Sequence, residues 1–191
     1  MRGARSVIAG LCLAVGLTAS IARADVPVPA RLQAQLIAKI AAFDRNFPGR
    51  AGANALVLVI FKPGDSDSSQ FAQQIAGELR TLADVGGVAS TVDVIPFAGA
   101  PALAATIRDR KAAVVYLSAD LDRDAAPVAG ALAGGDVLTI GATGAFAEAG
   151  TVIGFDLVGG KPKIVANLGV AKAQHVDLKA EFLRLTRIVG G

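Results

Sequence analysis

Five polar residues that could bind a small ligand follow the most apolar run of the chain. They are Lys62, Asp65, Ser66, Asp67 and Ser68. The run before them, Ala55–Phe61 (ALVLVIF), is typical of a strand buried on both faces of a parallel sheet. Loops after such strands meet at the carboxyl edge, where open α/β folds bind ligands. Lys62 and the free N–H groups of the next helix could hold an anion, although the two aspartates would repel it. A polar turn that caps a helix explains the same residues and is favoured.

A second polar turn is expected at the same edge of the sheet. Gly141, Thr143 and Gly144 follow an apolar strand predicted at residues 136–140. They could form the opposite lip of a ligand crevice. A flexible turn between a strand and a helix is the favoured interpretation of these residues too.

The residue types needed for catalysis or metal binding are scarce. His175 is the single histidine and no G-x-S-x-G motif occurs, so we interpret His175 as a surface or capping residue. Pro162 replaces the Ser or Thr of a phosphate-binding loop after Gly159-Gly160-Lys161, which indicates a hairpin turn instead. The charged segment 120–124 could bind a metal or a partner, but a solvated loop is favoured. We expect no catalytic residue, no metal and no cofactor.

The first 24 residues have the three parts of a secretory signal peptide. Arg2 and Arg5 precede an uncharged, mostly apolar run of 16 residues, 7–22, and Ala22-Arg23-Ala24 is a small-x-small cleavage site. The run is shorter than the roughly 20 residues that a spanning helix needs, so cleavage is favoured over an uncleaved membrane anchor. We therefore predict a signal peptide at 1–24, a single domain at 25–191 and a periplasmic protein.

Removal of the signal peptide would change the charge and the cysteine content. The 19 basic residues include Arg2, Arg5 and Arg23, whereas all 16 acidic residues follow the signal, so the mature chain would have no net charge. No basic patch suited to nucleic acid is evident. The lone Cys12 would also be lost, so a packed core rather than disulfides must stabilise the domain. No later segment is long and apolar enough to span a membrane.

Apolar periodicity predicts alternating helices and strands, and so an α/β fold with a mostly parallel central sheet flanked by helices. Two alternating runs joined by Gly159-Gly160 predict a C-terminal antiparallel hairpin. Asp177 would cap a final helix that buries Leu178, Phe182, Leu185 and Ile188. Asp67 and Gln70 would form a capping box for the second helix. The predicted helices are 32–47, 67–82, 101–110, 125–133 and 177–189, and the predicted strands are 55–61, 88–96, 112–117, 136–140, 151–158 and 163–168.

The order of several short motifs resembles the YfiR-like family. Phe47-Pro48 stands where that family has Trp-Pro, and the final helix resembles the family's last helix through Leu183-Arg184-Leu185. The remaining motifs are DVLTI at 136–140, GAF at 144–146, GTVIGF at 150–155 and KIVANL at 163–168. The resemblance covers residues 32–189 approximately.

The resemblance implies a periplasmic α/β protein that represses an inner-membrane diguanylate cyclase by contacting its periplasmic sensor. Some members carry regulatory disulfides, but the mature chain here has no cysteine, so redox control is not expected. A periplasmic small-ligand binding protein that uses the carboxyl edge of the sheet is the alternative function. A homodimer is also left open.

Overall fold

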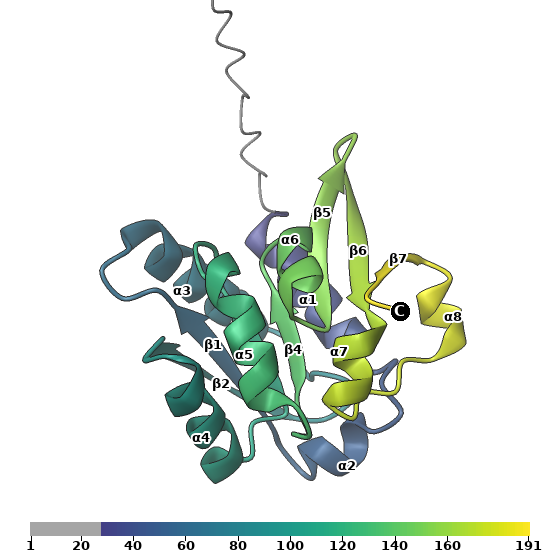
Figure 1. The fold of residues 1–191 in the computed structure, drawn as a ribbon, viewed down its shortest axis with the longest axis horizontal. Coiled ribbons are helices and arrows are strands. Elements are labelled where there is room, and N and C mark those ends of the chain that lie inside the picture. The colour runs from purple at the N-terminus through teal and green to yellow at the C-terminus, as the bar shows by residue number, and fades with distance from the viewer. Residues whose placement is uncertain (1–27) are drawn as a thin grey trace, which may run out of the picture.

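The described residues, 28–191 of this computed structural model, place seven strands in one sheet in the order β2-β1-β3-β4-β5-β6-β7 (Figure 1). The predicted signal peptide lies outside the described residues. Strands β1 to β5 run parallel, β6 runs antiparallel to β5, and β7 runs parallel to β6. The strands are β1 Ala55–Phe61, β2 Ser90–Pro96, β3 Val114–Leu117, β4 Leu138–Gly141, β5 Ile153–Val158, β6 Lys161–Asn167 and β7 Thr186–Val189.

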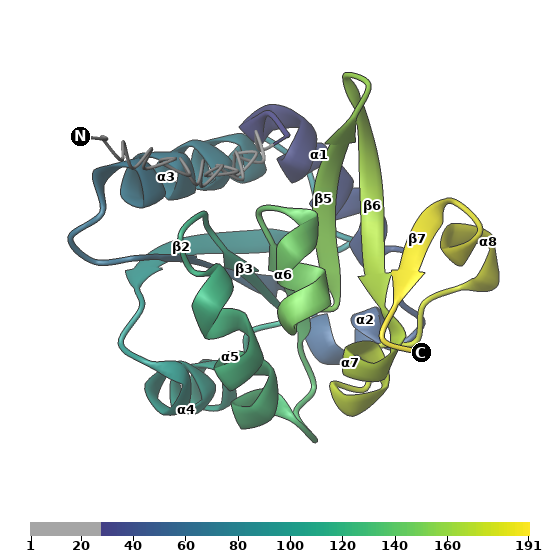
Figure 2. The same ribbon diagram turned by 45° about the horizontal axis from the view of Figure 1, so that its top comes forward.

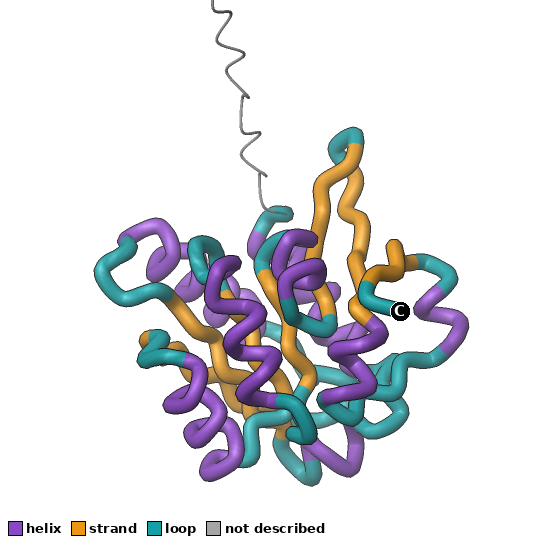
Figure 3. Tube along the Cα trace, viewed as in Figure 1, coloured by secondary structure: helices purple, strands orange, loops and turns teal. Residues whose placement is uncertain are grey.

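Helices cover both faces of this sheet, with the strands between them (Figures 2 and 3). Helices α1 and α3 pack together on one face, and α4, α5 and α6 lie on the other. The helices are α1 Ala30–Ala41, α2 Phe47–Ala51, α3 Ser66–Arg80, α4 Ala100–Arg110, α5 Ala125–Leu132, α6 Gly144–Ala149, α7 Leu168–Ala173 and α8 Ala180–Leu183. Among the described residues, no helix is long and apolar enough to cross a membrane. The α/β fold with its mostly parallel sheet and flanking helices is confirmed.

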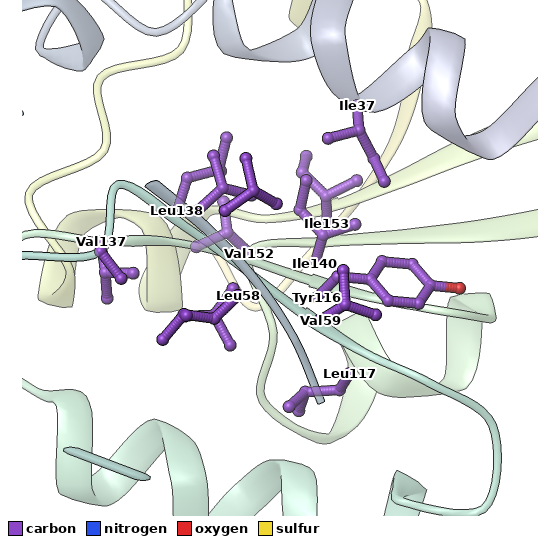
Figure 4. Close-up of a cluster of buried hydrophobic side chains, with 14 of the residues drawn as sticks. Ile37, Leu58, Val59, Tyr116, Leu117, Val137, Leu138, Ile140, Val152 and Ile153 are labelled. Carbon is purple, nitrogen blue, oxygen red and sulfur yellow. The ribbon is translucent and has the colours of Figure 1, made fainter. Parts of the chain in front are cut away.

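The core is built on rows of apolar side chains that cross the central strands. Val59, Tyr116, Ile140 and Ile153 are register partners on β1, β3, β4 and β5, so they share one face of the sheet. Ile37 of α1 lies over this row (Figure 4). All five side chains are fully buried. Burial of both sheet faces explains why the strands read as continuous apolar runs rather than alternating ones.

A buried amide anchors the first helix to the carboxyl edge of the sheet. The Tyr116 hydroxyl donates to Gln33 Oε1 at 2.8 Å. Burial raises the pKa of Tyr116 well above its ordinary value, so the hydroxyl stays protonated and keeps donating. Gln33 Nε2 donates in turn to the carbonyl oxygens of Val28 at 2.8 Å and Ala142 at 3.1 Å. Four buried polar groups thus satisfy one another.

The predicted C-terminal hairpin is confirmed. Strands β5 and β6 pair from Ile153↔Ala166 to Val158↔Lys161. Gly159 and Gly160 connect them with φ values of 57° and 75°, the backbone that a tight two-residue turn requires and that glycine adopts readily. The tip of this hairpin projects beyond the rest of the sheet (Figure 1).

The predicted final helix is wrong. Only Ala180–Leu183 is helical, and the chain then forms β7, which pairs with β6 from Ile164↔Thr186 to Asn167↔Val189. Leu185 and Ile188 are exposed rather than buried. The β-branched residues of 186–189 fit an edge strand, and the ladder with β6 outweighs a weak local helical preference.

Two helix boundaries also differ from the prediction. Asp65, not Asp67, caps α3, since its side chain accepts a hydrogen bond from the Ser68 backbone N–H at 2.9 Å. The first predicted helix is interrupted, because α1 ends at Ala41 and Phe47 begins α2. The turn between these helices contains Asp44, whose contacts are described below.

We predict that Gly141→Ala destabilises the protein by about 1–3 kcal/mol, the usual cost of overpacking a core. A methyl group at this position would overlap the side chain of buried Phe146. Gly77→Ala is the matched control, since its methyl group would meet open space on α3 and should stabilise the helix by about 0.5–1 kcal/mol. Urea denaturation measures both. Equal midpoints for Gly141→Ala and the unmodified protein would refute the clash.

Candidate functional site

Ser68 joins the loop after β1 to the loop after β3. The strand order of the sheet reverses between these two strands. Its hydroxyl lies 2.7 Å from the Ser118 hydroxyl and donates to the Ala119 carbonyl at 2.8 Å. The same oxygen accepts from the Lys62 backbone N–H at 3.0 Å. Ser118 follows β3 and Lys62 follows β1, so the contacts bridge neighbouring strands with oppositely directed connections. In open α/β sheets a ligand crevice forms at this position.

Lys62 is positioned by the same pair of loops. Its ammonium donates to the Asp120 carbonyl at 3.2 Å, and Asp120 has a positive φ of 67° that turns this loop. Lys62, Ser66 and Asp67 are exposed, whereas Ser68 is fully buried. The structure therefore brings three of the five candidate residues to an exposed rim beside half-buried Asp65, and Ser68 closes the gap between the two loops.

Gly141, Thr143 and Gly144 lie at the same edge of the sheet but form a separate group. The Gly144 N–H donates to Asp156 Oδ1 at 3.1 Å, and the Asp156 carboxylate is also bonded to Arg187 at 3.0 Å. Thr143 precedes α6 without a side-chain capping bond. Among the described residues, no hydrogen bond joins this group to the Lys62–Ser68 group.

A buried ion pair at the opposite edge was not anticipated from the sequence. The Arg50 guanidinium donates through Nη1 to Asp44 Oδ2 at 2.5 Å and through Nε to Asp136 Oδ1 at 2.7 Å. The side chains of Arg50 and Asp44 are 2% and 0% exposed. Asp44 Oδ1 also accepts the backbone N–H groups of Asn46 at 3.0 Å and Asp177 at 2.9 Å. The carboxylate is thus fully hydrogen-bonded, as a buried charge must be.

His175 belongs to this cluster through its backbone. Its carbonyl accepts from Asn46 Nδ2 at 2.7 Å and from Arg50 Nη2 at 3.2 Å. Its ring Nδ1 lies 3.0 Å from the Gly135 carbonyl, and the residue is exposed, as predicted for a surface residue. Within residues 28–191, no group of three or more His, Cys, Asp or Glu side chains is arranged to hold a metal.

The exposed large apolar side chains of the described residues all belong to the C-terminal quarter of the chain. Leu157 and Val158, 40% and 59% exposed, lie in the β5–β6 hairpin, and Leu185 and Ile188, 72% and 48% exposed, lie at β7. We call these four residues, which do not all lie on one face of the sheet, the C-terminal apolar surface. Beside them, hydrogen bonds to Asp156 and Glu148 raise the pKa of Arg187, which remains cationic. β7 ends the sheet, so one row of its backbone groups pairs with no other strand of the described residues.

The model of the YfiR/HmsC-like family, DUF4154, matches residues 30–187. The chain belongs to this family. No curated protein matches it significantly. The fold accounts for one of the YfiR-like motifs, because Asn167 caps α7 by accepting the Val170 N–H at 3.0 Å and donates to the Ala147 carbonyl of α6 at 2.7 Å.

Solved structures similar to this YfiR/HmsC-like chain share its fold at low identity. An ABC domain in complex with L-Trp from Streptococcus pneumoniae has a TM-score of 0.60 and 12% identity, over 84% of this chain and 62% of that one. A conserved domain protein from Vibrio cholerae has a TM-score of 0.56 and 11% identity, over 86% and 60%. A ligand-free, open substrate-binding protein with adhesive properties from Clostridium difficile has a TM-score of 0.54 and 11% identity, over 75% and 57%. The chain thus spans about three fifths of the length of these proteins.

We predict that Asp44→Ala lowers the free energy of unfolding by about 3–5 kcal/mol, because it leaves the buried Arg50 charge without its closest partner. Asp177→Ala is the matched control. It removes a carboxylate from the exposed pair with Arg45, whose side chains are 53% and 52% exposed, and should cost less than about 1 kcal/mol. Chemical denaturation of both variants checks this difference, and similar losses would contradict it.

Proposed function

We propose that this protein is a periplasmic, non-catalytic regulator that binds an inner-membrane partner of the diguanylate-cyclase type and represses it. Membership of the YfiR/HmsC-like family supports this role. The signal-peptide pattern of residues 1–24 supports export to the same compartment as the partner's sensor.

The C-terminal apolar surface is the observation that carries the proposal. Exposed apolar side chains on a projecting hairpin and at a sheet edge offer a protein partner both buried area and strand pairing. Leu185, the most exposed of the four, contributes little to the core of this chain. Contact with a partner would explain why a large apolar side chain is kept at this exposed position.

A non-catalytic role agrees with how the polar groups of the described residues are used. The carboxylates of Asp44 and Asp156 both hold backbone N–H groups and arginines of the same chain. Ser68 is buried and bonded on three sides. None of these groups is left as an activated nucleophile next to a base.

Cross-linking of the tagged protein in intact cells, followed by purification and mass spectrometry, tests the proposal. A membrane protein with a periplasmic sensor and a cyclase domain should be enriched, and deletion of the regulator should raise cyclic di-GMP. Leu185→Asp should reduce recovery of the partner about tenfold or more, as expected for a residue at the centre of an interface.

Ala102→Asp is the control, since it adds the same charge to an exposed position of α4. The regulator role fails if cross-linking works on a known periplasmic complex and no membrane protein is enriched. The assignment of the surface fails if both variants recover the partner equally.

Binding of a small ligand at the carboxyl edge is the second candidate function. The similar structures include proteins described as bound to L-Trp or as substrate-binding, and the loops after β1 and β3 occupy the position where such folds bind ligands. A ligand held there would contact the rim formed by Lys62, Asp65, Ser66 and Asp67. In a thermal-shift screen, a ligand of this site should stabilise the protein, and Lys62→Ala should abolish the shift while Lys39→Ala, on α1, retains it.

A further inference from the structure

A cavity of about 410 Å³ opens at the amino edge of the sheet, opposite the candidate ligand loops. It lies between the C-terminal turns of α4 and α5, the loop that leads into β4, and α2. Its volume falls within the range of pockets that bind small molecules.

The inner wall of this amino-edge cavity is apolar. Ile107, Ala112, Leu132 and Val137 line it, and each belongs to the buried core. The wall is therefore rigid and could bury the apolar body of a ligand without rearrangement of the fold.

The mouth of the amino-edge cavity is cationic. Arg108 and Lys111 line it, are exposed, and form no salt bridge within residues 28–191. The one acidic lining residue, Asp136, is already paired with Arg50. The C-terminal ends of α4 and α5 each contribute roughly half a negative charge. Together they offset about one of the two positive charges of Arg108 and Lys111, so the site keeps a net positive charge.

Lys111 occupies a backbone conformation that usually selects glycine. It ends α4 in the left-handed region, with φ 55° and ψ 49°. Glycine is the common residue at this place because a side chain there is strained by about 1 kcal/mol. The lysine is tolerated at this cost, and it lines the cavity.

We propose that the amino-edge cavity binds a small organic anion with an apolar body, such as an aryl carboxylate or an aryl phosphate. The apolar body lies against Ile107, Leu132 and Val137, and the anionic group pairs with Arg108 and Lys111. This binding needs neither the membrane partner nor the carboxyl-edge loops, so it can succeed or fail independently of the proposed function.

Titration of the isotope-labelled protein with phenylacetate, phenyl phosphate and the uncharged phenylacetamide tests this site by NMR. The two anions should shift the amide resonances of residues 107–112 and 131–137, and phenylacetamide should bind at least about tenfold more weakly. The relative affinities of the two anions identify the preferred anionic group.

Two variants separate binding from folding. Lys111→Gly should weaken binding of the preferred anion about tenfold, while the protein becomes as stable as before or more so, because glycine relieves the left-handed strain. Arg108→Gln should weaken binding similarly, and Lys39→Gln on the opposite face should leave it unchanged. The proposal is overturned if neither anion shifts these resonances at millimolar concentration, if phenylacetamide binds equally well, or if Lys111→Gly binds as the unmodified protein does.

Discussion

The Asp44 carboxylate holds the two ends of the domain together. It joins the segment after α1 to the segment before α8, and strands β1 to β6 lie between these segments in the sequence. It accepts hydrogen bonds from Arg50, from the turn after α1 and from the backbone of Asp177. A buried carboxylate is tolerated only when its oxygens are satisfied. The turn between α1 and α2, the side chain of Arg50 and the segment that leads into α8 supply the donors that meet this requirement.

Buried polar side chains serve a similar purpose at the carboxyl edge. Gln33 ties α1 to Tyr116 and to the loop after β4, and Ser68 ties the loop after β1 to the loop after β3. Hydrogen bonds within the chain thus hold these loops in place, and no ligand is needed to order them. The C-terminal apolar surface differs, because its side chains are exposed and could be covered by a partner.

The sequence predicted those features that depend on local pattern, and the elements that depend on distant pairing were missed. Continuous apolar runs such as ALVLVIF located the central strands, and two glycines located the hairpin turn. The helical spacing of Leu178, Phe182, Leu185 and Ile188 was misleading, since pairing with β6 decides the structure of 186–189. Both Asp65 and Asp67 could cap a helix. Asp65 is the cap in the structure, because the Ser68 backbone N–H lies where the Asp65 side chain can accept it. The candidate residues lie at the carboxyl edge of the sheet, as expected, but the contacts of Lys62 and Ser68 depend on the loop after β3, and the contact of Gly144 depends on Asp156 of β5.

The contact between Asp44 and Asp177 has a consequence for the order in which the structure can form. A chain that emerges from a ribosome or a membrane channel amino end first exposes Asp44 long before Asp177. Strands β1 to β4 can pair as they appear, but the corner that buries Arg50 must stay open until Asp177 is available. This corner can therefore close only once the chain has been made as far as Asp177, and a chain stalled before that residue retains an incompletely paired Asp44 carboxylate.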